Sequence, residues 1–155
     1  MIRTPAEASL DGKRIEMRSE RRVIPATVER VLAAVRPVGL PSDRLSDLAV
    51  AVSEALSNAA IHGNGLDPEK TVVITVHAVP GDRAVIEVQD HGHGFDVARL
   101  SDPTDPAQVL APSGRGVFLM RRLVDRLEYE DGGSRVRLTV GRRRASRRTL
   151  GNGRR

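Results

Sequence analysis

The sequence predicts an α+β protein, a two-layer α/β sandwich in which a mixed, mostly antiparallel sheet carries helices on one face. Two pairs of strand-like segments are each joined by a short glycine-containing turn, which is typical of antiparallel neighbours. Amphipathic helical patterns separate these segments. A sheet built mainly from hairpins covers one face with helices. The chain of 155 residues can bury one sizeable core, with little room for a second.

The first strand and the first helix follow from local pattern. Ile15 and Met17 alternate with charged residues, which predicts a half-buried strand. Pro25 then opens a segment whose valines and leucine recur at helical spacing over residues 28–35. Prolines and a glycine within 37–41 end this helix.

A second, longer helix is expected from Ser42 to about His62. Ser42 is a candidate N-cap, and leucines and valines recur along one face of the segment. Gly63 and Gly65, on either side of Asn64, predict the end of this helix.

The second half is expected to hold two hairpins and one helix. The first hairpin joins strands at 71–79 and 83–89, and the second joins strands at 126–130 and 135–140. Residues 96–113 lack periodicity, and a stretch of this length inside a compact domain is typical of a functional loop. A third helix is expected to begin after Gly114 and Gly116.

Composition excludes several classes of protein. The chain has no cysteine, which excludes disulfides and thiolate metal sites, and no apolar run long enough to span a membrane. Its first residues lack the apolar core of a secretion signal, so a cytoplasmic protein is expected. Seven arginines within 142–155 exceed the net charge of +5, so the basic pI describes this tail alone. A tail of this kind is either a solvated terminus or a contact for an acidic partner.

The second helix carries Glu54, Asn58 and His62 at successive steps of four residues. In a regular α-helix these side chains form one polar stripe beside the apolar face. An amide oxygen can ligate Mg²⁺, and a carboxylate one turn away can accept a proton. The alternative is a solvated helix face.

Asp90 directly follows a strand and is succeeded by Gly92 and Gly94. Glycines at alternate positions let the backbone approach a flat ligand, and a carboxylate there can accept a hydrogen bond from the amine of adenine. The alternative is a glycine-rich turn capped by Asp90. His91 and His93 are a weak candidate metal pair, because no third ligand accompanies them.

Gly114 and Gly116 flank Arg115 at the predicted start of the third helix. Free amides at a helix N-terminus bind anions, and glycines let phosphates come close. The alternative is a flexible hinge before a helix. The segment is neither a Rossmann fingerprint nor a Walker A loop, because the required third glycine and the Gly-Lys-Ser/Thr element are missing.

Taken in order, these segments resemble the GHKL (Bergerat-fold) ATPases, the superfamily of gyrase B, histidine kinases and MutL. Residues 52–63 resemble its N box, 90–96 and 113–120 its two glycine boxes, and 133–138 its last box, with Ser134 where threonine is commoner. The resemblance covers about residues 13–140. It implies a domain at 13–140, an extension at 1–12 and an arginine-rich tail at 141–155.

The resemblance implies a role for each matched residue. Glu54 is the implied general base, Asn58 the Mg²⁺ ligand and Asp90 the adenine anchor, and residues 97–113 form a lid over ATP. The residues implied to contact the nucleotide are Asn58, His62, Asp90, Gly92, Gly94, Phe95, Ser113, Gly114, Arg115, Gly116, Val117 and Ser134.

Within the superfamily the sequence is similar to RsbW-like anti-sigma-factor serine/threonine kinases, since only about 40 residues, none of them histidine, precede the helix of Glu54. Such proteins bind a sigma factor. They also transfer the γ-phosphate of Mg·ATP to a Ser or Thr of an anti-anti-sigma partner with the STAS fold. The resemblance further implies a homodimer. From the composition, neither a membrane nor direct nucleic-acid contact is expected. The alternatives are a non-catalytic ATP-binding regulator of the same fold and a nucleic-acid binder acting through the arginine tail.

Overall fold

The computed structural model describes residues 12–92 and 112–143. These residues form one antiparallel sheet in the order β1-β2-β3-β5-β4, with α1, α2 and α4 beside it. The strands are β1 (Lys13–Arg18), β2 (Thr71–Val79), β3 (Arg83–Gln89), β4 (Arg126–Glu130) and β5 (Arg135–Gly141). The helices are α1 (Ile24–Val35), α2 (Ser42–Ser57) and α4 (Pro112–Leu123).

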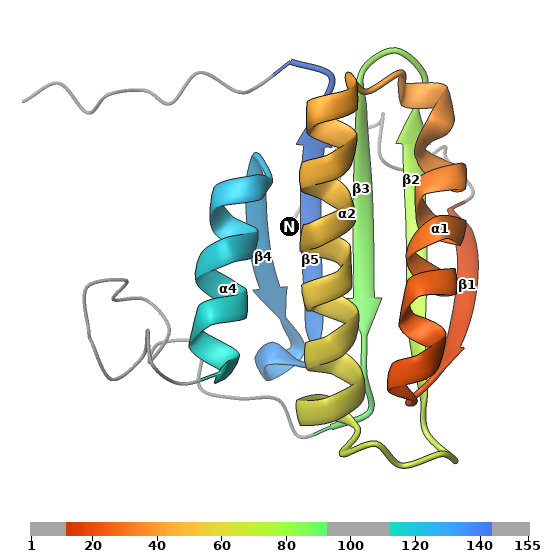
Figure 1. The fold of residues 1–155 in the computed structure, drawn as a ribbon, viewed down its shortest axis with the longest axis vertical. Helices are drawn as coiled ribbons and strands as arrows, with labels where there is room; N and C mark the ends of the chain where they lie inside the picture. Colours follow the sequence, from red (N-terminus) through yellow and green to blue (C-terminus); the bar gives the residue numbers. More distant parts are fainter. Residues whose placement is uncertain (1–11, 93–111, 144–155) are drawn as a thin grey trace, which may run out of the picture.

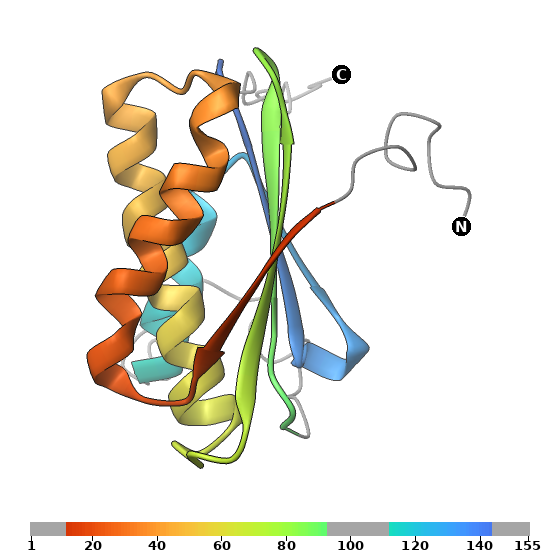
Figure 2. The same cartoon turned by 90° about the vertical axis from the view of Figure 1, so that its right-hand side faces the viewer.

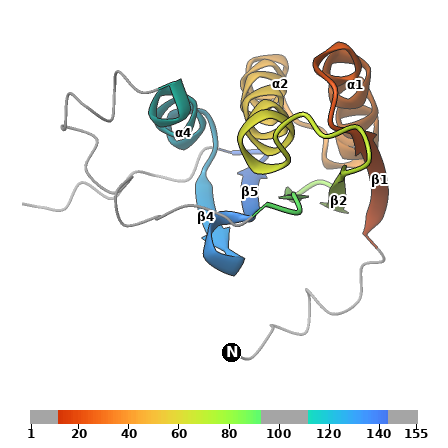
Figure 3. The ribbon, with the colours of Figure 1, turned by 90° about the horizontal axis from the view of Figure 1, so that it is seen from below.

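The three helices lie side by side on one face of the sheet (Figure 1). Viewed edge-on, the helices form one layer and the strands the other (Figure 2). The view from below shows the same two layers, with α2 between α1 and α4 (Figure 3). The predicted α+β sandwich is therefore confirmed, and every strand pairing within the described residues is antiparallel.

The hydrophobic core lies between the two layers, because each strand alternates buried and half-exposed positions. Every second residue of the three central strands points toward the helices and is almost completely buried. These residues are Val72, Ile74, Val76, Ala84, Ile86, Val88, Val136, Leu138 and Val140. The helices contribute Val31, Val35, Leu48, Val52, Leu56 and Met120. α2 lies between the other two helices and is packed into the core, so side chains on it are held by a well-packed element.

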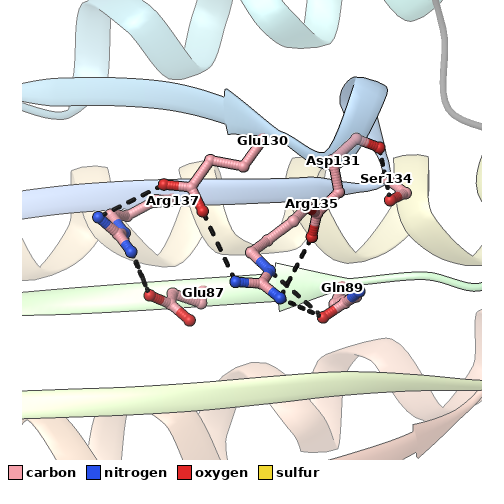
Figure 4. A network of polar contacts seen from close by, with 7 residues as sticks. All are labelled: Glu87, Gln89, Glu130, Asp131, Ser134, Arg135 and Arg137. Carbon is pink, nitrogen blue, oxygen red and sulfur yellow. Dashed lines mark hydrogen bonds and ion pairs between the residues drawn. The ribbon is translucent and has the colours of Figure 1, made fainter. Parts of the chain in front are cut away.

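The other face of the sheet carries a network of charged side chains (Figure 4). Arg137 on β5 donates to Glu87 on β3 at 2.8 Å and pairs with Glu130 on β4 at 3.5 Å. Arg135 contacts Gln89 at 3.1 Å and Asp131 at 3.2 Å. Opposite charges on neighbouring strands favour this strand order, each pair contributing a fraction of a kcal/mol, roughly 0.2–1 kcal/mol.

Three helix boundaries differ from the sequence-based expectation. Ser42 is the first residue of α2 and makes no capping bond, because Pro41 occupies the N-cap position. After Ser57 the chain continues as a π-helical turn, Asn58–Gly63. α4 begins at Pro112, so Gly114 and Gly116 lie inside its first turns rather than before it. Proline is well suited to the first turn of a helix because its φ is already helical and it has no amide to leave unpaired.

Candidate nucleotide site

Glu54 and Asn58 lie where α2 passes into the π-turn. Both side chains are half-buried, whereas His62, four residues further on, is exposed. The π-turn has i→i+5 bonds, among them the bond from the amide of Asn64 to the carbonyl of Ala59 at 2.8 Å. Because this wider turn rotates the residues that follow, the single polar stripe expected from α-helical spacing is broken. Glu54 and Asn58 stay together, and His62 differs from them in its exposure.

Gly116 of α4 packs against this polar pair. A Cβ atom at position 116 would lie 2.9 Å from Oε2 of Glu54 and 3.2 Å from Nδ2 of Asn58. Real Cβ atoms essentially never approach another atom to 2.9 Å, so only glycine lets α4 come this close without displacing Glu54. Two segments that are far apart in the sequence, 52–63 and 113–120, therefore meet here.

Asp90 directly follows β3 and is 9% exposed. Its backbone amide donates to the carbonyl of Ser134 at 2.9 Å, which holds it beside the end of the last hairpin. Oδ1 of its carboxylate accepts the amide of Gly92 at 2.7 Å. This is a tight Asx-type turn, in which the side chain fixes the backbone two residues ahead.

The end of the π-turn closes against Asp90. A Cβ on Gly63 would overlap the carboxyl group of Asp90, and a Cβ on Gly92 would overlap the carbonyl oxygen of Gly63. The segment that carries Glu54 and Asn58 therefore also carries, at its other end, the glycine that contacts Asp90. One continuous helical segment connects the polar pair to the aspartate.

Burial raises the pKa of the Asp90 carboxyl group above its ordinary value. The hydrogen bond from the amide of Gly92 and the positive charges of His91 and Lys70 act in the opposite direction and lower it. A carboxylate kept partly desolvated in this way gains much when a ligand supplies a hydrogen-bond donor. The position is suited to binding an amino group.

Asn64 is a buried residue of this region that sequence reasoning did not select. It is 3% exposed, and its Oδ1 accepts the amide of His91 at 2.7 Å. In the sequence it stands between Gly63 and Gly65, where the pattern indicates only the end of a helix. A polar residue of this kind is indistinguishable from a solvated turn residue until its partners are known.

The remaining predicted site residues divide into three groups. Gly94, Phe95, His93 and most of the predicted lid, 97–111, lie outside the described residues. Ser113 and Gly114 belong to the first turn of α4. Arg115 is exposed, Val117 is 4% exposed in the hydrophobic core, and the hydroxyl of Ser134 donates to the carbonyl of Asp131 at 3.0 Å. Of these residues, Val117 contributes packing of α4 to the core rather than a polar contact.

Two further observations concern the described part of the chain. Within it, no group of three or more histidine, aspartate or glutamate side chains could hold a metal ion by itself. No helix in these same residues combines the length and apolar character needed to cross a bilayer.

Comparison with known proteins agrees with this geometry. The model of the histidine kinase-like ATPase domain matches residues 18–140, and the chain belongs to this family. It is 34% identical over 101 residues to an anti-sigma F factor of Clostridium perfringens, an alignment covering 61% of this chain and 70% of that protein.

Two Bacillus proteins give similar alignments. A serine-protein kinase RsbW of Bacillus pumilus is 34% identical over 100 residues, covering 60% of this chain and 62% of that protein. The RsbW protein of Bacillus licheniformis is 32% identical over 109 residues, covering 66% and 68%. The similarity to ATPases of the GHKL type and to RsbW-like proteins, expected from the ordered motifs, is confirmed.

Proposed function

We propose that the chain is an ATP-binding anti-sigma factor and serine/threonine protein kinase. It would transfer the γ-phosphate of Mg·ATP to a Ser or Thr of a STAS-domain partner and so regulate transcription by partner switching. The observation that carries the proposal is that one helical segment contacts Gly116 through Glu54 and Asn58 and contacts Asp90 through Gly63. The relatives named anti-sigma F factor and serine-protein kinase support it.

The residues present fit an adenine nucleotide. Asp90 offers a buried acceptor for the exocyclic amine of adenine. Guanine has a carbonyl in that position, which would place two acceptors face to face. Gly63 and Gly92 remove the side-chain bulk around it. We assign Asp90, Gly92, Gly94 and Phe95 to the base, and Ser113, Gly114, Arg115, Gly116 and Ser134 to the phosphates.

Magnesium also fits the polar pair. Asn58 would supply an amide oxygen as a ligand, with His62 nearby on the same segment. Because no described cluster holds a metal alone, the remaining ligands would be phosphate oxygens and water, which is how Mg²⁺ is usually bound. When bound, the ion would neutralise charge on the phosphates.

Glu54 is proposed as the general base. Its carboxylate is half-buried, and Gly116 leaves no side chain between it and α4. It would accept the proton of the Ser or Thr hydroxyl as that oxygen forms its bond to the γ-phosphorus and the bond to the leaving ADP breaks. A purely regulatory nucleotide binder has no use for a carboxylate in this position, which favours the kinase over that alternative.

Several finer expectations belong to the same proposal. We infer a homodimer that binds a sigma factor in the cytoplasm, without direct contact with nucleic acid. The division into residues 1–12, 13–140 and 141–155 stays a prediction. Light scattering at micromolar concentration tests the dimer, and deletion of 142–155 tests whether the tail contributes to nucleotide binding, for which no loss is expected.

The decisive experiment is a phosphotransfer assay with labelled Mg·ATP and a STAS-domain protein. Label on a Ser or Thr of the partner supports the kinase, and a partner with that residue changed to alanine is the control. Glu54→Ala should bind nucleotide and lose transfer, whereas Glu29→Ala, which removes an exposed carboxylate of α1, should behave as wild type. Nucleotide binding with no transfer to any partner would instead support the non-catalytic regulator.

A further inference from the structure

Asn64 joins three separate segments of the chain beside the proposed adenine site. Its Nδ2 donates to Oγ of Ser19 at 2.9 Å and to the carbonyl of Thr71 at 3.1 Å. Its Oδ1 accepts the amide of His91 at 2.7 Å. The partners determine the orientation of the amide group, because a carbonyl can only accept and a backbone amide can only donate.

Ser19 extends this network away from the site. It is 1% exposed and donates its own hydroxyl hydrogen to the carbonyl of Lys70 at 2.6 Å. Asn64 is therefore anchored from behind, on the ends of β1 and β2, by groups that are themselves held in place. A side chain with all its bonds satisfied by fixed partners has one orientation.

The anchored amide group acts on the turn that follows Asp90. Two consecutive backbone amides of this turn donate hydrogen bonds. The amide of His91 donates to Oδ1 of Asn64, and the amide of Gly92 donates to Oδ1 of Asp90. These two amides belong to consecutive peptide planes, which share the Cα atom of His91. Fixing the amide of His91 therefore limits where the amide of Gly92 can point, and with it the direction of the carboxylate.

We propose that Asn64 is a positioning residue that sets the direction of the Asp90 carboxylate and thereby the preference for adenine over other purines. The inference rests on the proposed function, in which Asp90 accepts the amine of adenine. Asn64 acts through the amide of His91 and not by contact with the base. Its Oδ1 accepts the hydrogen bond that positions the turn, and its Nδ2 makes the hydrogen bonds that hold the Asn64 side chain in place.

The test compares binding of ADP and inosine diphosphate by calorimetry in the presence of Mg²⁺. The two nucleotides differ at the group that Asp90 would recognise, so their affinity ratio reports the direction of the carboxylate. The wild type should prefer ADP. Asn64→Ala should lower this preference at least tenfold, as expected for loss of a well-directed bond to a charged acceptor.

A matched variant separates positioning from stability. Ser19→Ala removes a buried partner of Nδ2 and leaves the bond to His91, so it should lower the melting temperature and keep the preference. If Asn64→Ala does not fold, Asn64→Ser replaces it. The oxygen of serine lies one bond closer to the backbone than Oδ1 of asparagine.

The outcomes are distinct. A wild-type preference that persists in Asn64→Ala or Asn64→Ser overturns the inference while leaving the proposed function intact. Loss of preference in Ser19→Ala to the same extent overturns it as well, because the effect would then follow stability alone. A wild type that binds both nucleotides equally contradicts the assignment of Asp90 itself, and the inference with it.

Discussion

At the scale of single residues, the buried carboxyl group of Asp90 carries a cost in stability. Its carboxyl group is 9% exposed, and burial raises its pKa, so the ionised form is less favourable in the folded protein than in water. A donor supplied by a ligand would offset this cost. Residues of this kind are retained for function at the expense of stability.

Asp90→Asn is expected to weaken nucleotide binding and leave the free protein as stable as the wild type or more stable. The amide can still accept the bond from Gly92, and it removes a charge that is poorly solvated. Loss of the charged acceptor should lower the affinity about 10- to 100-fold. Calorimetry and thermal unfolding of the free protein measure the two effects. Unchanged affinity would contradict the assignment of Asp90 to adenine.

Nucleotide affinity is expected to fall as the pH is lowered through the raised pKa of Asp90. The acceptor gains a proton there, at a higher pH than an ordinary aspartate. The effect on the free protein has the opposite sign. Between the ordinary and the raised pKa the folded state holds a proton that the unfolded state has lost, so the stability contributed by Asp90 decreases as the pH rises through that range. Binding titrations against pH should lose this step in Asp90→Asn.

Gly116→Ala separates helix stability from catalysis. Alanine is favoured over glycine inside a helix by about 1 kcal/mol. Its Cβ would lie 2.9 Å from Oε2 of Glu54, so that carboxylate must move. We expect an unchanged or higher melting temperature together with phosphotransfer reduced at least about tenfold. The exposed Arg121 of the same helix provides the control, since Arg121→Ala should leave transfer unchanged.

At the scale of secondary-structure elements, a buried ion pair connects the ends of the two helices that bear on the site. Arg44 in the first turn of α2 pairs with Asp125, which follows α4, and donates to the carbonyl of Gly141 at 2.8 Å. The amide of Gly141 donates in turn to Asp125 at 2.6 Å. Arg44 and Asp125 thereby attach the start of α2 and the end of α4 to the end of β5.

Removing one partner of this pair is expected to destabilise the protein strongly. The side chains of Arg44 and Asp125 are only 5% and 15% exposed, so Asp125→Asn or Arg44→Met should cost about 3–5 kcal/mol. The double variant should be less destabilised than the sum of the single ones. Urea unfolding measures all three, with removal of the exposed pair Arg14–Glu16 as the control that changes little. Additive losses would contradict the coupling.

At the scale of the whole molecule, the candidate site is assembled from segments that lie on both layers. Asp90 follows β3 of the sheet, Glu54 and Asn58 belong to α2 and the π-turn that continues it, and Gly116 belongs to α4. A ligand that contacts all of them must hold the helical layer against the sheet. Binding and global stability should therefore be linked.

Mg·ADP at 100 times its dissociation constant is expected to raise the free energy of unfolding by about 2.7 kcal/mol, because it binds only the folded chain. Glu54→Ala should show the same increase in the free energy of unfolding, because this substitution is expected to affect phosphotransfer and not nucleotide binding. Asp90→Asn should show much less at the same concentration. Thermal unfolding with and without nucleotide gives these values, and an increase in Asp90→Asn equal to that of the wild type would indicate another binding site.

Local pattern was sufficient for the elements of the fold, and it singled out Glu54, Asn58, Asp90 and Gly116, whose roles in a site stay predictions. The alternation of buried and half-exposed residues at Val72, Ile74 and Val76 depends only on neighbours in the chain, and so does the glycine turn between two strands. The strands and the face of the sheet that the helices cover could therefore be predicted. The order of the motifs was sufficient for the family. Tertiary contact decided the rest. The π-turn, the closure of Gly63 on Asp90 and the three partners of Asn64 involve segments far apart in the chain, and no periodicity records which buried groups will meet.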